Sequence, residues 1–350
     1  MKIKPEKINL FTSRLKQEAK YYCSKKFTEI NENSDKSKII TEKIGPCRPK
    51  VWCAKSPPVL YGTEKLKSAA INLTEEEIID AVGIMGIGGS WAPEDCKARH
   101  SVCIIIPYRD RQDHLWTLLH RLIPLLKRQQ LDFKIFVVEQ VSNATFNKGA
   151  IMNAAFLTIY RNYGLRNADD WHKGLYNCYI FHDVDMLPED DRNMYSCSKF
   201  PKHLSVAVNE FKYKLPYHHL VGGVFNIRPK HYFRVNGYSN LFWGWGGEDD
   251  DMGYRIEHVG LPITRPPEHF GRYTMVKHIK RKPLAHAVRL KLVHTSQKRY
   301  KYDGLNTLKY KVCSVDSEKL FTRILVDVGD IPDYVRSFET KQSSTKKKNQ

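Results

Sequence analysis

The sequence of 350 residues lacks a hydrophobic run long enough to span a membrane. Its longest charge-free apolar run toward the N-terminus, residues 81–93, has 13 residues and is rich in glycine, whereas a spanning helix needs about 20 apolar residues. Lys and Arg occur throughout the first thirty residues, where a cleavable signal would need an apolar segment. Taken alone, these absences predict a soluble, cytosolic chain.

Several catalytic and metal-binding signatures are also absent. There is no G-x-S-x-G elbow, no Walker loop, no H-E-x-x-H helix and no internal repeat. The eight cysteines include no C-x-x-C pair, which disfavours a zinc ribbon or a redox motif and leaves disulfides open. Two sequons, at Asn72 and Asn143, are candidate N-glycosylation sites. Disulfides and sequons would indicate a lumenal protein, in tension with the absence of a targeting segment.

The chain is strongly basic, with 57 Lys and Arg against 38 Asp and Glu and a net charge of +19. Residues 1–50 carry +7, residues 271–311 carry +11 and residues 341–350 carry +4, which leaves −3 for the rest. A domain that binds a nucleic-acid backbone with a whole face would distribute its charge differently. A polyanion-binding protein is therefore a rival interpretation that explains the charge but not the motifs below.

Short apolar runs alternate with helical patterns along the middle of the chain, and 41% of all residues are hydrophobic. Residues 101–106, 133–138 and 178–181 predict buried strands, and residues 115–126 and 148–160 predict helices. This alternation predicts an α/β fold with a mostly parallel sheet, whose ligands lie beyond the carboxyl ends of the strands.

Two carboxylates, Asp183 and Asp185, directly follow the third predicted strand. Such a pair can hold a divalent cation that neutralises a diphosphate. The alternative is an acidic turn before Pro188. Further along, Met275 and His278 could join Asp185 in a ligand set suited to manganese, if the fold brings them together, or could simply pack and carry surface charge.

Residues 243–251 combine tryptophans, glycines and four successive carboxylates. Glycines allow a loop to move, and flat rings offer stacking surface for a sugar, so the segment suits a lid. Neighbouring carboxylates repel one another, and one with a raised pKa could act as a general base. The alternative is a buried tryptophan followed by a solvated acidic run. The glycines at 83–89 follow a helix-like segment rather than a strand, and we expect a turn there.

Together these motifs resemble the β-1,4-galactosyltransferase family of Golgi glycosyltransferases, from about Cys53 to Asp330. The segments that carry the resemblance are 104–111 (IIIPYRDR), 146–148 (FNK), 181–188 (FHDVDMLP), 222–223 (GG), 242–251 (FWGWGGEDDD), 275–278 (MVKH) and 303–308 (DGLNTL). The resemblance implies a single catalytic domain of GT-A fold with two mobile loops, over residues 47–338. Residues 1–46 would then be a flexible stem and residues 339–350 a disordered basic tail.

The resemblance also implies a site. The donor-binding residues would be Pro107, Tyr108, Arg109, Arg111, Phe146, Asp183, Val184, Leu220, Trp245 and Gly246, and the acceptor-binding residues Phe211, Tyr217, Trp245, Asp249 and Asp250. Asp185, Met275 and His278 would ligate Mn²⁺, and Asp249, together with Glu248, would be catalytic, with Asp249 as the base. Arg289 is a guess for the acceptor-site arginine, because the segment before His294 is two residues shorter than in the best-known members.

The same comparison implies the cysteine pairing. Cys53 would pair with Cys96 and Cys178 with Cys197, while Cys103 would remain a free thiol in a buried strand. Cys23, Cys47 and Cys313 are left unassigned. Because family members are type II Golgi proteins, a Golgi lumenal location is implied, and a chain without a span would be an incomplete gene product or a soluble form.

One position departs from the galactosyl pattern. Galactosyl members carry a tyrosine, beside the 2-substituent of the donor sugar, where this chain has Leu220. A smaller side chain leaves room for an acetamido group, as in invertebrate members that transfer N-acetylgalactosamine (GalNAc). We therefore expect transfer of GalNAc from UDP-GalNAc to the 4-hydroxyl of a terminal β-linked N-acetylglucosamine (GlcNAc). The alternatives are a β-1,4-galactosyltransferase that uses UDP-Gal and an inactive, sugar-binding relative.

Overall fold

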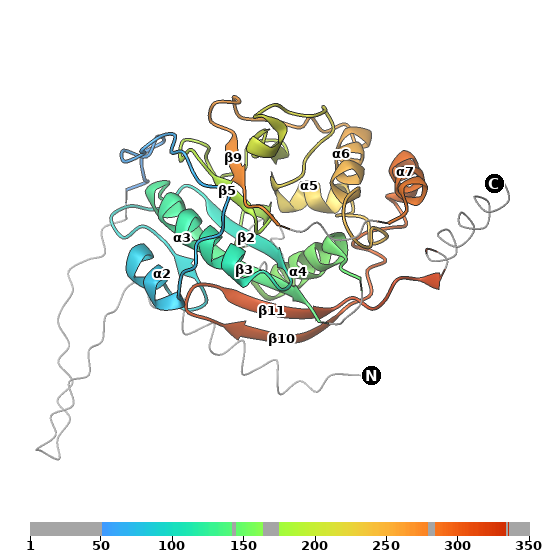
Figure 1. Cartoon of the computed structure of the whole chain (residues 1–350), viewed down its shortest axis with the longest axis horizontal. Helices are drawn as coiled ribbons and strands as arrows, with labels where there is room; N and C mark the ends of the chain where they lie inside the picture. Colours follow the sequence, from blue (N-terminus) through green and yellow to red (C-terminus); the bar gives the residue numbers. More distant parts are fainter. Residues whose placement is uncertain (1–50, 142–144, 164–174, 279–283, 334, 336–350) are drawn as a thin grey trace, which may run out of the picture. The chain divides into compact units, whose positions relative to one another are not determined.

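An eight-stranded β-sheet lies at the centre of the structure, which is a computed structural model (Figure 1). The structure describes residues 51–141, 145–163, 175–278, 284–333 and 335. The expected stem and basic tail, the sequon at Asn143, and Cys23 and Cys47 all lie outside the described residues.

The central sheet has the strand order β10-β11-β3-β2-β4-β8-β6, and β1 pairs with β3. Its strands are β1 (Ser90–Trp91), β2 (Ser101–Tyr108), β3 (Asp132–Gln140), β4 (Cys178–His182), β6 (Lys202–His203), β8 (Val224–Ile227), β10 (Lys311–Ser317) and β11 (Thr322–Asp327). Strands β11, β3, β2 and β4 run parallel, whereas β10, β8, β6 and β1 pair antiparallel with their neighbours. The predicted α/β fold is confirmed, with a sheet that is parallel at its centre and antiparallel at its edges.

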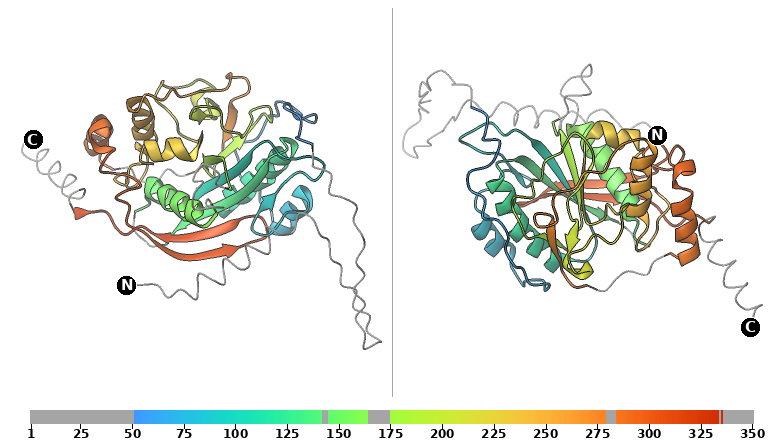
Figure 2. Two further views of the ribbon diagram at one scale, coloured as in Figure 1. Left: turned by 180° about the vertical axis from the view of Figure 1, so that it is seen from behind. Right: turned by 90° about the horizontal axis from the view of Figure 1, so that it is seen from above.

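Both faces of the sheet are covered by helices, which explains the continuous apolar runs in the sequence. Along β2, Val102, Ile104 and Ile106 belong to the core cluster beneath α3 (Gln112–Arg128). The alternate residues Cys103 and Ile105 belong to the cluster beneath α4 (Lys148–Tyr163). All five of these side chains are buried. The helices α3 and α4 thus lie on opposite faces of one sheet (Figure 2).

A second, three-stranded sheet of order β5-β9-β7 stands beside the end of β4. Its strands are β5 (Met186–Pro188), β7 (Ala207–Val208) and β9 (Arg272–Met275). Strand β5 directly follows Asp185, and its first residue Met186 lies opposite Met275 of β9. The N–H of Val276 donates to the carbonyl of Asp185 over 2.8 Å. This pairing brings residues 275–278 beside Asp185 although about ninety residues separate them in the chain.

The remaining helices are α2 (Glu75–Val82), the 3-10 helix η1 (Asn209–Phe211), α5 (Pro229–Arg234), α6 (Glu248–His258), α7 (His286–His294) and α8 (Ser296–Arg299). Helix α2 ends at Gly83, whose N–H bonds the carbonyl of Ile79. The glycines that follow lie in a turn closed by pairing of Gly86 with Ser90. The predicted turn at residues 83–89 is therefore present.

The described residues contain two disulfides, and they are the two pairs that the resemblance implies. Cys53 bonds Cys96, and Cys178 bonds Cys197. Cys103 is a buried free thiol in β2, and Cys313 is an exposed free thiol on β10. Among the described residues, no helix is both long and apolar enough to cross a membrane.

Candidate active site

A cleft of about 530 Å³ opens where β2, β3 and β4 end, a volume typical of sites for small molecules. Almost all of the predicted site residues line it. They are Pro107, Arg109, Arg111, Phe146, Asp183, Val184, Asp185, Phe211, Tyr217, Leu220, Trp245, Gly246, Glu248, Asp249, Asp250, Met275, His278 and Arg289. Residues from seven separate stretches of the chain, between residues 107 and 289, therefore meet at the edge of the sheet where an α/β fold binds ligands.

Tyr108 is the exception among the predicted donor-binding residues. Its side chain is buried in the core cluster beneath α3 and is not one of the groups that line the cleft. The alternation of β2 explains this position, since Tyr108 points to the same face as Ile106. Within the run 107–111 the cleft receives the side chains of Pro107, Arg109 and Arg111.

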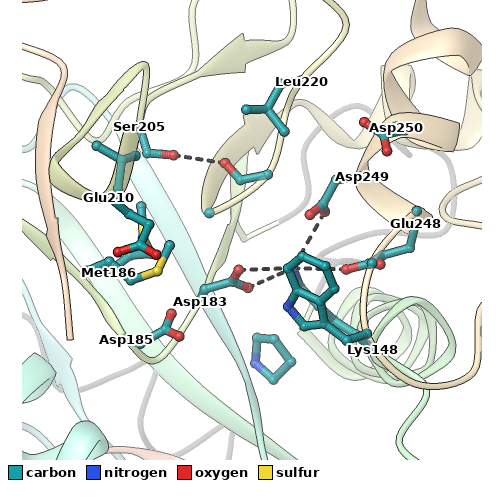
Figure 3. Close-up of a pocket in the computed structure, with 18 of the residues that line it drawn as sticks. Lys148, Asp183, Asp185, Met186, Ser205, Glu210, Leu220, Glu248, Asp249 and Asp250 are labelled. Atoms are coloured by element: carbon teal, nitrogen blue, oxygen red, sulfur yellow. Dashed lines mark hydrogen bonds and ion pairs between the residues drawn. The ribbon is translucent and has the colours of Figure 1, made fainter. Parts of the chain in front are cut away.

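Lys148 stands at the centre of the cleft and contacts three carboxylates (Figure 3). Its ammonium nitrogen lies 2.8 Å from Asp183, 3.2 Å from Glu248 and 3.5 Å from Asp249. Burial alone would lower the pKa of Lys148, but the three carboxylates raise it well above its ordinary value. A permanently charged lysine therefore ties the end of β4 to the first turn of α6.

The carboxylates around Lys148 differ in acidity. Burial raises the pKa of Asp249 well above its ordinary value, and Glu248 adds to the rise while Lys148 opposes it. Burial also raises the pKa of Asp183, to about 6, again against the charge of Lys148. A carboxylate with a raised pKa is a stronger base, so Asp249 has the acidity expected of a group that accepts a proton.

Asp185 has a different environment, because cationic groups surround it. Its carboxylate lies 2.9 Å from Nδ1 of His278 and 3.3 Å from the guanidinium of Arg111. Burial would raise the pKa of Asp185, but His278 and Arg111 lower it below the ordinary value. The bond to Asp185 in turn raises the pKa of His278.

The donor set around Asp185 fits manganese. Two adjacent ligands of an octahedral ion lie about 3 Å apart, close to the separation of the Asp185 oxygen and the His278 nitrogen. Met275 lines the same wall of the cleft and would add a thioether, a softer ligand than magnesium prefers. Within the described part of the chain, no three His, Cys, Asp or Glu side chains form a metal cluster. The predicted set contains only two such residues, with methionine as the third.

Aromatic and polar side chains form the outer wall of the cleft. Trp245 and Tyr217 are both about half exposed, and the Tyr217 hydroxyl donates to Asp250 over 2.7 Å. Phe211 and Arg289 line the opening as well. Flat rings beside a carboxylate are the usual means of binding a sugar, which presents an apolar face and a rim of hydroxyls.

The two tryptophans of the Trp-Gly segment have separate roles. Trp243 is 4% exposed and packs with Phe242, Val288 and Leu292, so it belongs to the core. Trp245 is 45% exposed and lines the cleft. The alternative of a buried tryptophan therefore holds for Trp243, whereas Trp245 presents its ring to the cleft.

Gly222 leaves room for the candidate base. A Cβ atom at this position would lie 2.7 Å from Oδ2 of Asp249 and 3.4 Å from Cδ1 of Leu220. A side chain there would therefore displace Asp249. Gly222 thus allows the first turn of α6 to approach the edge of the sheet closely, whereas a Cβ atom at Gly223 would meet Ser205 and Met186 instead.

Some residues of the cleft were not predicted. Lys148 and Met186 were part of matching segments but were given no role, and Ser205, Glu210 and Val293 were not identified at all. The sequence offered a weak signal for Lys148, a lone cation at the start of an apolar helix after a strand. It gave no indication that three carboxylates would surround that cation, because they come from two distant segments.

Comparisons with known proteins agree with this geometry. Residues 53–198 match the model described as the N-terminal region of glycosyl transferase group 7, and residues 202–279 match the one described as the N-terminal domain of galactosyltransferase. β-1,4-Galactosyltransferase 5 of zebrafish (Danio rerio) is 37% identical over 293 residues, which cover 82% of this chain and 74% of the relative.

Solved structures are similar as well. Two crystal structures of Drosophila β-1,4-galactosyltransferase 7 superpose with TM-scores of 0.54 and 0.52, at 28% and 27% identity. Each match covers 66% of this chain and 94% of the fly chain. One of those crystals contains xylobiose, and the other, of a mutant, contains manganese, UDP-Gal and xylobiose.

Proposed function

This chain is a glycosyltransferase of the β-1,4-galactosyltransferase family, with a GT-A fold, and we propose that it transfers GalNAc from UDP-GalNAc to the 4-hydroxyl of terminal β-linked GlcNAc. The observation that carries the choice of donor is Leu220. Its side chain lines the same cleft as Asp183 and Asp249, and Figure 3 shows it above both. A leucine is shorter than the tyrosine of galactosyl members and leaves space for the acetamido group at C2 of the donor sugar. A pocket contact of this kind shifts discrimination by about 1–3 kcal/mol.

The proposed reaction is a single inverting displacement. Asp249 takes the proton of the acceptor 4-hydroxyl, which then attacks the anomeric carbon, and UDP leaves from the opposite face. Burial and Glu248 raise the pKa of Asp249 and make it a better proton acceptor. Lys148 holds Asp183, Glu248 and Asp249 in fixed positions so that the base requires no rearrangement.

Manganese is the proposed cofactor. Asp185, Met275 and His278 would hold it, and when bound it would neutralise the charge that develops on the leaving diphosphate. Arg109 and Arg111, at the end of β2, would contact the diphosphate directly, and the ring of Phe146 packs against the Arg109 guanidinium at 5.2 Å. The guanidinium of Arg111 also forms an ion pair with Asp185, the carboxylate proposed to bind the metal.

The acceptor would bind at the outer wall. Trp245, Tyr217 and Phe211 would stack against the GlcNAc ring, and Asp250 would accept a hydrogen bond from it.

We further propose residues 47–338 as the catalytic domain and the Golgi lumen as its location, where both disulfides would be stable. A protein that only binds polyanions would have no use for a buried cluster of carboxylates around one lysine.

A donor comparison tests the proposal. Purified protein with Mn²⁺ and a GlcNAc acceptor should show a several-fold higher kcat/KM with UDP-GalNAc than with UDP-Gal. Leu220→Tyr should move the ratio toward UDP-Gal. Leu290→Tyr is the matched control, since Leu290 lines the same cleft from α7 and the same substitution there should leave the ratio unchanged. A several-fold preference of the unmodified protein for UDP-Gal would overturn the choice of donor.

A further inference from the structure

Four charged side chains, two aspartates and two arginines, form a closed ring of hydrogen bonds at the first turn of α6. Asp251 accepts hydrogen bonds from Arg255 over 2.5 Å and from Arg299 over 2.6 Å. Asp303 accepts from the same two arginines, at 3.2 Å from Arg255 and in a close contact with Arg299. Arg255 is 0% exposed and Arg299 18% exposed at the side chain. Because aspartates and arginines alternate around the ring, each buried charge is paired with two of opposite sign, and none is left unpaired to destabilise the fold.

The ring joins three segments of the chain, and one of them, α6, also lines the cleft. Asp251 and Arg255 belong to α6, and Arg299 ends α8. Arg299 also donates to the carbonyl of Leu292 over 2.7 Å, near the end of α7. Asp303 accepts from the N–H of Asn240 over 2.8 Å, in the loop that leads to the Trp-Gly segment. One arginine therefore connects both helices that form the outer part of the cleft.

The start of α6 needs such support. Its N-cap is Gly247, which has a left-handed φ of 101° and offers no side-chain cap for the first turn. The first turn consists of four successive carboxylates, which repel one another. Lys148 holds Glu248 and Asp249 on the cleft side. The Asp251 carboxylate accepts hydrogen bonds from Arg255 and Arg299, and its carbonyl accepts one from the hydroxyl of Ser296.

We propose that Arg299 is a positioning residue for the transfer reaction. It fixes the first turn of α6, with Glu248 and Asp249, against α7, whose residues Arg289 and Val293 line the cleft. This role rests on the proposed function, because it assumes that Asp249 acts on a bound acceptor. Arg255 lies within α6 itself and stabilises the helix, whereas Arg299 alone links that helix to the carbonyl of Leu292.

Arg299 can position α6 because its planar guanidinium group has two terminal nitrogens that donate in different directions. Its two terminal nitrogens serve Asp303, Asp251, Ser239 and the carbonyl of Leu292 at once. A lysine carries the same charge at a single point and cannot span these partners. Displacing a catalytic group by about 1 Å can reduce the rate of reaction on the order of 100-fold without removing any group that touches substrate.

The test is Arg299→Lys, with Arg323→Lys as the matched control. Arg323 pairs with Glu139 over 2.9 Å, on the sheet and outside the cleft. We expect kcat of Arg299→Lys to fall roughly 10- to 100-fold while the affinity for UDP with Mn²⁺, measured by calorimetry, stays within twofold. The control should keep both values. A kcat equal to that of the control in folded protein would overturn the proposal.

Two further measurements separate positioning from a purely structural role. In Arg299→Ala, added ethylguanidinium should restore part of kcat, since the side chain reaches the surface; absence of any rescue in folded protein would count against the role. Hydrogen exchange of the amides at 248–252 should be faster in Arg299→Lys than in the unmodified protein, with α3 unchanged. This readout needs no turnover, so it tests the ring even if no UDP-sugar proves to be a donor. Unchanged exchange at 248–252 would overturn the proposal independently.

Discussion

At the scale of single residues, the carboxylates of the cleft differ in acidity because their burial and their charged neighbours differ. Asp185 has a lowered pKa and stays ionised, whereas burial raises the pKa of Asp183 and Asp249. Carboxylates of different acidity can fill different roles, one as ligand and another as base. The residue identities alone do not reveal this division, because all three are aspartates in acidic runs.

Replacing the proposed base gives the sharpest prediction at this scale. Asp249→Asn removes the proton acceptor with almost no change in shape, so kcat should fall by about 10²- to 10⁴-fold. Calorimetry should show an unchanged affinity for UDP with Mn²⁺, because Asp249 is not among the metal ligands. Asp316→Asn, on the exposed strand β10, serves as the control and should keep full activity. Transfer within tenfold of the unmodified protein would remove Asp249 from the role of base.

At the scale of elements, helix α2 combines two functions in one threonine. Thr74 caps the helix: its hydroxyl accepts from the N–H of Glu77 over 3.2 Å, and the Glu77 carboxylate accepts from the N–H of Thr74 over 2.8 Å. Thr74 is also the third residue of the sequon that begins at Asn72, which is exposed. A substitution of Thr74 can therefore remove both the sequon and the helix cap, and its effect on stability alone would not distinguish the two.

Substitutions at the two positions should separate these effects. In protein from a eukaryotic secretory host, both Asn72→Gln and Thr74→Ala should lose the mass of one glycan. Only Thr74→Ala should also lower the free energy of unfolding through the cap, by about 0.5–2 kcal/mol when compared with deglycosylated Asn72→Gln. Thr74→Ser should keep both glycan and cap. Equal stability of the two deglycosylated variants would show that the cap contributes nothing.

The sequence predicted the elements with strong local signals and missed those that depend on distant pairing. Strands β2, β3 and β4 are buried on both faces and appear as continuous apolar runs. Strands β5, β7 and β9 have only two to four residues, too few for a period to be visible. The proposed ligand set of Asp185, Met275 and His278 was predicted from the residue types and from the family resemblance, and the pairing of β5 with β9 explains why Met275 lies beside Asp185. Lys148 and Arg299 escaped prediction because their partners come from other segments.

At the scale of the whole molecule, the positive charge has several locations. Within the basic segment 271–311, His278 and Arg289 line the cleft and Arg299 belongs to the buried ring. Others, such as Lys291 and Lys298, lie on exposed faces of α7 and α8. Among the described residues of this segment, the positive charge is therefore divided between the cleft, the buried ring and exposed helix faces.

Stability should depend on pH through buried His203. Its ring is fully buried between the carbonyl of Gly222 and Ser205, and burial lowers its pKa to about 3. A histidine with a depressed pKa stabilises the fold fully above its unfolded pKa of about 6.5, and this contribution falls as the pH drops below that value.

The comparison with His203→Gln isolates this effect. Asp183 and Asp249, whose pKa values are raised, act in the opposite sense as the pH falls, so absolute stabilities mix the contributions. Between pH 7 and pH 5, the difference in unfolding free energy should shift by about 2 kcal/mol in favour of the variant. Denaturant titrations at both pH values measure it, with the exposed His286→Gln as control. A constant difference would show that His203 titrates alike in the folded and unfolded chain.

The short antiparallel pair of β5 and β9 sets the register between Asp185 and Met275, two of the proposed metal ligands. Met186 lies opposite Met275, and the backbone bond from Val276 to Asp185 fixes the spacing between the two strands. A change in the length of a loop between these strands would therefore leave the register of Met275 against Met186 intact. A single-residue deletion inside β9 would instead place a neighbouring residue opposite Met186, where Met275 now stands.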